Sequence, residues 1–379
     1  MKLATKLIHA GAEPDPSTGA IMTPIFQTST FVQESPGVNK GYEYARTQNP
    51  TRDALQTALA AIENGKYGLC FASGSAATDA VIKLLNPGDE VIAANDMYGG
   101  TYRMFTKIFQ KYGLKFHFIN MQDANEISKY INKNTKLIWT ETPTNPMMNI
   151  TDIAAVAAIA KPHNILLCVD NTFASPFLQN PLDLGADIVL HSATKYLGGH
   201  SDSVHGCLIV NDKSLNDQLA FIQNSCGAVP GPQDCFLILR GLKTLHVRMQ
   251  RHCENGEKIA RWLKQNPKVD KVLWCGFEDH PNHAIAKKQM RGYGGMMSFT
   301  LKDDNIDAAF KVLSTTKLFA LAESLGGVES LIGHPASMTH ASIPREERLK
   351  TGLVDSLIRL SVGIEDADDL IADLNSAIG

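Results

Sequence analysis

A small-residue turn, a tyrosine, an aspartate and a lysine each follow an apolar run of this chain within a few residues. If those runs are strands of one open α/β sheet, the four groups lie at the carboxyl ends of the strands, where such sheets bind ligands. A turn that leads into a helix can hold an anion, and a tyrosine can stack on a flat ring. A buried carboxylate requires a cationic partner, and a desolvated amine can act as a nucleophile.

The lysine is Lys195, which follows the apolar run 188–190 and comes shortly after the hydroxyls of Ser192 and Thr194. A lysine at the end of a buried strand loses hydration, which lowers its pKa and suits it to Schiff-base chemistry. The two hydroxyls can bind phosphate oxygens. Taken singly, a lysine at a strand end is more often a solvated surface group.

The aspartate is Asp170, which ends the apolar run 165–169. A carboxylate there needs a partner that offsets its desolvation. A protonated aromatic ring nitrogen is one such partner, because a carboxylate that keeps this nitrogen protonated makes the ring an electron sink. A metal ion or a helix cap is the competing explanation.

The turn contains Gly74 and Ser75 and leads into a predicted helix, whose free N–H groups and positive dipole end can hold a phosphate. Such turns also exist simply to let a helix pack on a strand. Tyr98 precedes two glycines and can lie flat on a planar cofactor, although a packed loop tyrosine is the simpler alternative. Along the chain the four groups follow one another as phosphate-binding turn, stacking tyrosine, carboxylate and lysine. This combination in this order predicts pyridoxal 5′-phosphate bound to Lys195.

Apolar runs and helical periods alternate along the middle of the chain, which predicts βαβ units and a mainly parallel sheet with helices on both faces. The expected strands are 67–72, 90–94, 115–119, 136–140, 165–170, 187–191 and 205–210, and the expected helices between them are 76–85, 101–112, 125–132 and 152–161. Residues 1–50 have little helical period and are expected to form an extended arm. Residues 51–245 would be the α/β domain. A helix over 249–265 and strands over 296–301 and 357–363 would belong to a smaller α+β domain, 246–379.

The 379-residue chain has a formal net charge of −3 and no basic run, so nucleic acid and anionic membrane are poor candidates as partners. Its seven cysteines form no C-x-x-C pair and mostly lie in apolar runs, which favours reduced thiols in a core. No apolar run approaches the ~20 residues of a membrane span. We therefore expect a cytoplasmic protein with no membrane contact.

The segment 192–202, with Lys195 and then Gly198-Gly199-His200-Ser201-Asp202, is similar to the lysine signature of the Cys/Met-metabolism family of pyridoxal-phosphate enzymes. The resemblance extends over nearly the whole chain and implies a fold-type I transferase-like fold. It implies that Lys195 binds the cofactor and moves the substrate proton, that Asp170 pairs with the ring nitrogen, and that Tyr98 stacks on the ring and assists proton transfer. The phosphate contacts that it implies are Gly74, Ser75, Ser192 and Thr194. The family often has Met where this chain has Ser75. A contact from the backbone N–H to the phosphate does not depend on that side chain.

The same resemblance implies a homo-oligomer, usually a dimer of dimers, in which Tyr44 and Arg46 of the arm reach the phosphate of the neighbouring subunit. It implies that Arg359 clamps the α-carboxylate of an amino-acid substrate and that Asn145 supports it. Glu323 would face the distal amino group of cystathionine, with Ser324 beside it as a further substrate contact. Without the resemblance, Arg359 is an arginine inside an apolar strand that requires an anion.

The implied reaction is elimination or replacement on a sulfur amino acid, with cystathionine as substrate or product of γ-elimination or γ-replacement. β-Elimination of cystathionine to homocysteine, pyruvate and ammonia is the alternative. Gly100 stands where methionine γ-lyases tend to carry cysteine, which disfavours that activity.

Three alternatives come from other classes. A dinucleotide-dependent enzyme would carry G-x-G-x-x-G after its first strand, which this chain lacks. A zinc site would have to use His191, His200, His205 and Cys207. Their spacing matches no common zinc pattern, so no metal is predicted. A noncatalytic scaffold would usually have lost Lys195 or Asp170 first, and both are present.

Overall fold

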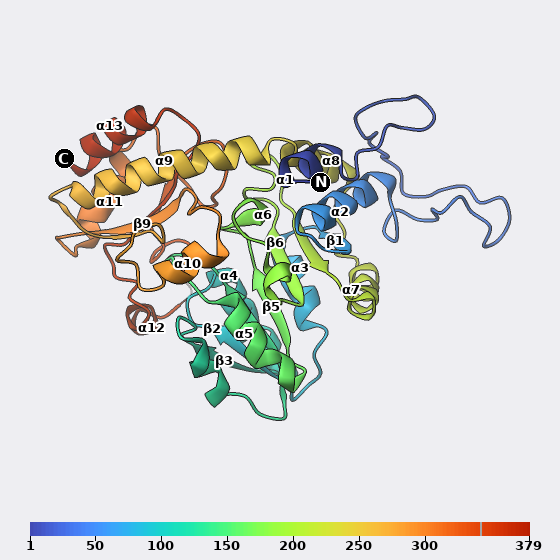
Figure 1. Cartoon of the computed structure of the whole chain (residues 1–379), viewed down its shortest axis with the longest axis horizontal. Coiled ribbons are helices and arrows are strands. Elements are labelled where there is room, and N and C mark those ends of the chain that lie inside the picture. Colours follow the sequence, from blue (N-terminus) through green and yellow to red (C-terminus); the bar gives the residue numbers. More distant parts are fainter. Residues whose placement is uncertain (342) are drawn as a thin grey trace.

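The computed structural model describes residues 1–341 and 343–379, and two β-sheets organise it (Figure 1). The larger sheet has seven strands in the order β1-β7-β6-β5-β4-β2-β3. Its strands are β1 (Tyr67–Phe71), β2 (Glu90–Ala94), β3 (Lys115–Ile119), β4 (Thr135–Glu141), β5 (Leu166–Asp170), β6 (Ile188–Ser192) and β7 (Gly206–Val210). All seven strands expected from the sequence are present, each within one residue at either end.

The larger sheet is mainly parallel, as predicted. Neighbouring strands from β6 through β5, β4 and β2 to β3 all pair in parallel, whereas β7 runs antiparallel to both β6 and β1. Parallel strands end at the same edge of a sheet, so Asp170 at the end of β5 and Ser192 at the end of β6 are brought to one place.

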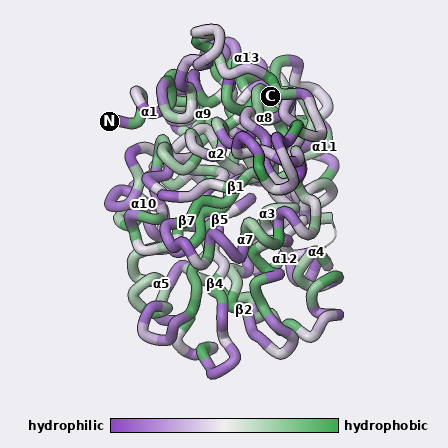
Figure 2. The backbone as a smooth tube through the Cα atoms, turned by 90° about the vertical axis from the view of Figure 1, so that its right-hand side faces the viewer, coloured by the Kyte–Doolittle hydropathy of each residue, from purple (hydrophilic) through white to green (hydrophobic). Residues whose placement is uncertain are grey.

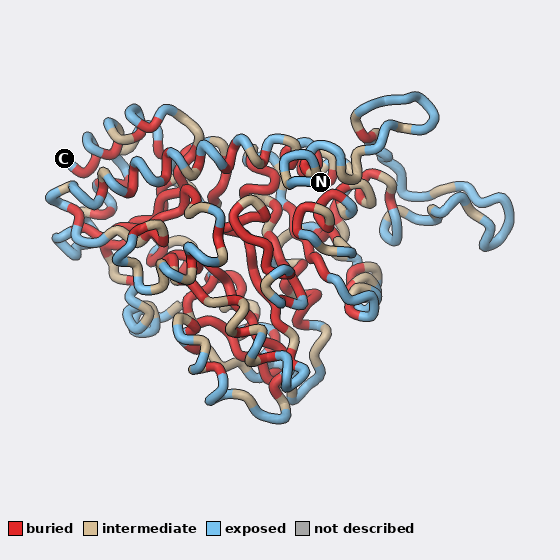
Figure 3. Tube along the Cα trace, viewed as in Figure 1, coloured by how far each residue is buried: buried red, intermediate tan, exposed pale blue. Residues whose placement is uncertain are grey.

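Helices cover both faces of this sheet. They are α1 (Leu3–His9), α2 (Pro50–Ile62), α3 (Gly74–Ile82), α4 (Gly99–Lys107), α5 (Ile153–Ala160), α6 (Ser175–Leu178), α7 (Lys213–Cys226) and α8 (Pro232–Leu242), with 3₁₀ turns η1 (Phe109–Tyr112), η2 (Ala124–Lys129), η3 (Lys161–His163) and η4 (Pro181–Leu184). Val189 and Leu190 are consecutive in β6, yet Val189 packs in the core that includes α2 and Leu190 in the core that includes α3. The strands are therefore buried on both faces. Figure 3 shows that buried residues are concentrated in the interior of the body, and Figure 2 shows hydrophobic stretches of the chain there.

One predicted helix is replaced by a shorter element. The helix expected over 125–132 is the 3₁₀ turn η2, in which Ile127 is the only buried residue. A single apolar anchor does not supply the continuous apolar stripe that holds a longer helix on a sheet.

The C-terminal region is the expected α+β arrangement, with a five-stranded sheet in the order β10-β11-β12-β9-β8. Its elements are α9 (Leu245–Gln265), β8 (Val269–Leu273), α10 (His283–Gln289), β9 (Met296–Leu301), α11 (Ile306–Thr315), β10 (Ala320–Leu321), β11 (Leu331–Gly333), α12 (Arg345–Lys350), β12 (Ile358–Ser361) and α13 (Ala367–Ile378). The long helix α9 begins four residues before the predicted start and runs from the larger sheet to this one (Figure 1).

The N-terminal arm is only partly extended. The expectation of little helix in residues 1–50 is wrong at Leu3–His9, which forms α1. Leu3 and Leu7 are four residues apart and so lie on one helix face, through which Leu7 is buried in the core shared with α2. The remainder projects from the body as the blue loops of Figure 1, with Ile21 and Val32 exposed by 82% and 95%.

In the described part of the chain, no helix has both the length and the apolar character that a membrane span requires. The seven cysteines are all free thiols, and five of them, Cys70, Cys168, Cys207, Cys235 and Cys275, are buried.

Candidate active site

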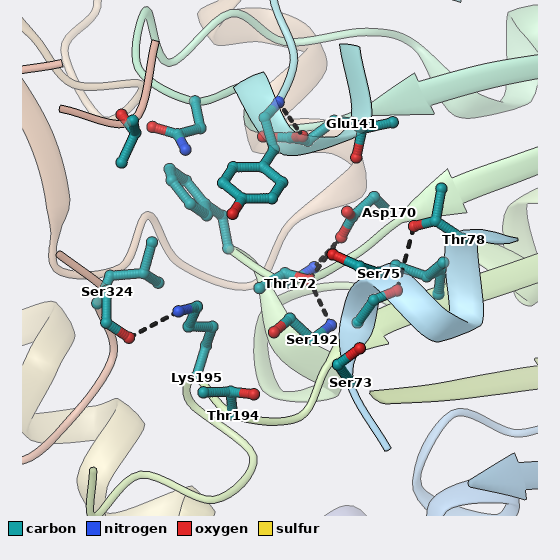
Figure 4. A pocket seen from close by; sticks show the side chains of 18 of the residues that line it. Ser73, Ser75, Thr78, Glu141, Asp170, Thr172, Ser192, Thr194, Lys195 and Ser324 are labelled. Carbon is teal, nitrogen blue, oxygen red and sulfur yellow. Dashed lines mark hydrogen bonds between the residues drawn. The ribbon is translucent and has the colours of Figure 1, made fainter. Parts of the chain in front are cut away.

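A cavity of about 240 Å³ lies where β4, β5 and β6 end, and residues of the C-terminal region close its other side. Eleven residues singled out from the sequence line it: Gly74, Ser75, Tyr98, Asn145, Asp170, Ser192, Thr194, Lys195, Glu323, Ser324 and Arg359. In Figure 4, Ser75, Asp170, Thr172 and Ser192 gather on one side of the cavity and Lys195 with Ser324 on the other. Folding thus brings together groups that are far apart in the chain.

The N-terminus of α3 forms one wall of this cavity. The side chain of Ser73 caps the helix by accepting the N–H of Ala76 at 3.0 Å. The N–H groups of Gly74 and Ser75 in the first turn have no partner within the helix and remain available to an anion. A Cβ atom at Gly74 would lie 2.9 Å from Cβ of Ser192, so only glycine lets the helix start so close to β6.

Asp170 ends β5 and is nearly buried, with 8% of its surface exposed. Burial raises the pKa of this carboxyl group, and hydrogen bonds from Thr172 oppose the rise. The Thr172 hydroxyl and N–H both donate to Oδ1, at 2.5 and 3.0 Å. No described residue donates to Oδ2, which is therefore free to accept a hydrogen bond from a protonated ring nitrogen.

Lys195 lies in the turn after β6, and its Nζ donates to Oγ of Ser324 at 2.6 Å (Figure 4). Burial and the positive charge of Arg359 lower the pKa of this amine to about 8, while the carboxylate of Glu323 acts in the opposite direction. The lysine is thus desolvated, as expected from its place after a buried strand. Ser324 itself has a φ of +89°, a backbone conformation that non-glycine residues rarely adopt and that costs energy.

Arg359, on β12, faces the cavity from the C-terminal region and is 4% exposed. Its Nη1 donates to Oδ1 of Asn145 at 3.0 Å and its Nη2 to the backbone oxygen of Ser324 at 2.8 Å. Burial lowers the pKa of the guanidinium to about 10. Both partners are neutral, and no carboxylate of the described residues forms an ion pair with it, so the arginine can bind an anionic group of a ligand.

Sequence reasoning missed Glu141 as a member of this site. Its Oε2 accepts the backbone N–H of Tyr98 at 3.0 Å, and the carboxyl group lines the cavity. Burial, and then the negative charge of the neighbouring Asp170, raise the pKa of Glu141 well above its usual range. Glu141 directly follows the expected strand 136–140, so the rule that identified Asp170 could have found it.

Tyr44 and Arg46 do not reach the cavity of their own chain. Nη1 of Arg46 donates to the backbone oxygen and to Oδ1 of Asn224, at 2.5 and 2.9 Å. The guanidinium lies 5.6 Å from the centre of the Tyr44 ring. Their contact with a neighbouring subunit stays a prediction.

The histidines considered as zinc ligands have other surroundings. Nε2 of His191 and Oε1 of Glu63 form a buried pair at 2.6 Å. His205 is buried, which lowers its pKa to about 3. Across the described residues, no three His, Cys, Asp or Glu side chains converge as metal ligands would.

These features fit pyridoxal 5′-phosphate: the N–H groups of α3 for its phosphate, the free oxygen of Asp170 for its ring nitrogen, and the amine of Lys195 for its aldehyde carbon. The fold and the cavity together define a pyridoxal-phosphate enzyme of fold type I. The chain belongs to the family described as Cys/Met metabolism PLP-dependent enzyme, whose sequence profile matches residues 4–379. This assignment excludes the dinucleotide-dependent alternative.

Several relatives resemble the chain over almost its full length. It is 54% identical over 376 residues to cystathionine beta-lyase of Coxiella burnetii, covering 99% of this chain and 97% of the relative. It is 53% identical over 378 residues to cystathionine gamma-lyase of Dictyostelium discoideum, covering 100% and 97%. The crystal structure of cystathionine gamma-lyase from Lactobacillus plantarum complexed with L-serine matches with a TM-score of 0.97 at 47% identity, covering 100% of this chain and 99% of that one.

Proposed function

We propose that this enzyme cleaves the bond between sulfur and Cγ of cystathionine, which releases cysteine, 2-oxobutyrate and ammonia with uptake of one water. The observation that carries the proposal is that Glu323 and Arg359 line the same cavity as Lys195. The Glu323 carboxylate forms no hydrogen bond or ion pair with the described residues. One cavity thus offers a cation for a carboxylate and an anion for a second amino group, which suits an amino acid that is charged at both ends.

Arg359 would orient the substrate. Its planar guanidinium can bind the α-carboxylate through two parallel hydrogen bonds, and Asn145, already bonded to Nη1, keeps the fork in place. Glu323 would then receive the distal ammonium group on the far side of the sulfur. These two charged contacts place the reacting carbons between them, within reach of Lys195.

Lys195 would transfer the proton. Pyridoxal 5′-phosphate, when bound, supplies the ring that takes up electrons released at the substrate carbon. A pKa near 8 leaves the amine close to half protonated at slightly alkaline pH, where it can take a proton from Cα and act again at Cβ. Two transfers by one amine lead to loss of the group on Cγ, whereas a single transfer leads to loss from Cβ.

The test is a product assay with cystathionine and purified holoenzyme, with Lys195→Ala as the inactive control. Cysteine with 2-oxobutyrate is the expected outcome, and we expect the variant to lose at least ~10⁴-fold in kcat/KM together with the visible absorption band of the wild type. Homocysteine with pyruvate would show β-elimination instead and overturn the proposed bond cleavage.

β-Elimination is the second candidate, because the relative in Coxiella burnetii is named a cystathionine beta-lyase. γ-Replacement, which would form cystathionine from cysteine and an activated homoserine ester, uses the same two charged contacts. The ratio of 2-oxobutyrate to pyruvate distinguishes γ-elimination from β-elimination. Incubation of cysteine with O-acetylhomoserine or O-succinylhomoserine measures γ-replacement.

We also propose that the functional unit is a homo-oligomer, with Tyr44 and Arg46 of one copy completing the phosphate site of another. In support, the cavity wall at α3 is formed by neutral groups, and the arm carries exposed apolar residues that a second copy would cover. The domain limits 51–245 and 246–379 belong to the same proposal, as does a cytoplasmic location, which the free cysteines support. Two measurements test the role of the arm. The affinity for the cofactor should fall in Arg46→Ala, and sedimentation analysis determines whether the protein is an oligomer.

A further inference from the structure

A buried histidine of the C-terminal region lies between two backbone carbonyl groups of the active-site loops. His340 is 2% exposed, and its Nε2 is 3.2 Å from the oxygen of Met97 and 3.1 Å from the oxygen of Asn145. Met97 precedes Tyr98, and Asn145 bonds Arg359 through its side chain. One imidazole thus connects the loop of the ring-stacking tyrosine with the loop of the carboxylate clamp.

The surroundings of the ring determine its tautomer. Carbonyl oxygens only accept hydrogen bonds, so Nε2 carries the hydrogen and shares it between the two oxygens. Nδ1 then accepts the hydroxyl of Thr339 at 2.8 Å. Burial and the nearby charge of Arg359 lower the pKa of His340 to about 4, so the ring stays neutral.

The backbone around His340 also presses on the Tyr98 loop. A Cβ atom at Gly99 would lie 2.2 Å from the backbone oxygen of Thr339, so glycine is required for this close approach. Tyr98 is therefore held on both sides from the C-terminal region, by the His340 ring at Met97 and by the Thr339 backbone at Gly99.

We propose that His340 is a positioning residue that sets the distance between the cofactor-stacking ring of Tyr98 and the Asn145–Arg359 clamp for the α-carboxylate. Without the imidazole, two carbonyl oxygens would face each other across a buried space with no donor, and the two loops would separate. A displaced clamp binds the carboxylate less well but leaves the amine-binding chemistry of the pocket intact. The inference rests on the role of Arg359 proposed above.

A second contact joins the same two loops but comes from the large sheet alone. Asp96 accepts the Thr144 hydroxyl and, at 3.1 Å, the Asn149 side-chain N–H. This contact maintains the fold of the loops when His340 is replaced. Loss of His340 should therefore change the alignment of the site rather than unfold it.

The experiment measures binding of two amines that carry no leaving group to holoenzyme, through the change in the visible spectrum of the cofactor. Glycine has an α-carboxylate and methylamine has none, so the ratio of their Kd values reports on the clamp. We expect His340→Phe, which keeps the ring volume without a donor, to reduce the preference for glycine about tenfold, the factor that matches one unpaired buried hydrogen-bonding group. His340→Gln, whose amide can donate from nearly the same place, should stay within about threefold of wild type.

His334 provides the matched control. It precedes His340 by six residues and is 1% exposed, and its two ring nitrogens bond Ser337 and Asp355 of the C-terminal region. His334→Phe should leave the ratio unchanged. An equal loss in His334→Phe, or no loss in His340→Phe, would overturn the role of His340.

If His340→Phe does not fold, His340→Met replaces it, because methionine also fills the space without offering a hydrogen-bond donor to the two carbonyl oxygens. An unchanged ratio in folded His340→Met overturns the inference. A wild type with no preference for glycine contradicts the clamp itself, and this inference with it, whereas a wild-type preference that no variant alters contradicts only His340.

Discussion

The two sides of the cavity are built in different ways. On the cofactor side, Ser73 and Asp170 obtain their positions from the larger sheet and from bonds to residues within a few positions, Ser73 to Ala76 and Asp170 to Thr172. On the substrate side, Arg359 is held by Asn145 and Ser324, which are 214 and 35 residues away. The first side is a local structure repeated at several strand ends, and the second exists only when the C-terminal region packs on the sheet.

From this difference we expect that cofactor binding and substrate alignment can be disturbed separately. Substitutions on the sheet side should affect the affinity for pyridoxal 5′-phosphate, and substitutions on the other side should affect recognition of the α-carboxylate. The three variants below, ordered from the largest expected effect to the smallest, test that separation.

Asp170→Asn should raise the Kd for pyridoxal 5′-phosphate about 100-fold, because an amide does not compensate the charge of a buried ring nitrogen. Titration of cofactor-free protein measures it. Asp187→Asn is the control, since Asp187 lies at the opposite end of the β5–β6 pair and its oxygen accepts Leu167 N–H at 2.8 Å, which an amide oxygen can also do. A Kd for Asp170→Asn within threefold of wild type would contradict a ring-nitrogen contact.

Arg359→Lys should raise the Kd for glycine about 30-fold and leave those for methylamine and cofactor unchanged, because lysine keeps the charge but loses the planar fork. Arg291→Lys is the same substitution at an arginine that bonds the backbone of Pro176 and Phe177 outside the cavity. If the binding of glycine and that of methylamine weakened equally, Arg359 would not act on the α-carboxylate alone, and the proposed separation of the two sides would be wrong.

Glu323→Gln should lower the pKa of Lys195 below its value of about 8, because the negative charge of Glu323 stabilises the protonated amine. The neutral amine reacts with the cofactor, so the rate of cofactor addition to cofactor-free protein should rise with pH through this pKa. The midpoint of that rise should move to lower pH by less than about one unit. Glu254→Gln, an exposed residue of α9, serves as control, and a midpoint that moves to higher pH would contradict the assigned contact.

Much of the cofactor side could be predicted from the sequence. Each strand is a short apolar run in the sequence, and each functional group lies at the end of its strand or within a few residues of it. The parallel order of the strands was therefore enough to gather Gly74, Asp170 and Lys195 at one edge. The same rule extends to Glu141. The helix α1 was missed because its burial depends on packing against α2 rather than on a long apolar period.

The sequence by itself determined the strands, their helices and the groups at the strand ends, because apolar periodicity and local order are written in neighbouring residues. Only the tertiary structure decided that Ser324 accepts a hydrogen bond from the amine of Lys195, which is 129 residues away. The same holds for His340, which bridges Met97 and Asn145 at separations of 243 and 195 residues. Contacts of that separation leave no local pattern in the chain. They arise when the C-terminal region packs against the sheet and buried polar groups must find partners.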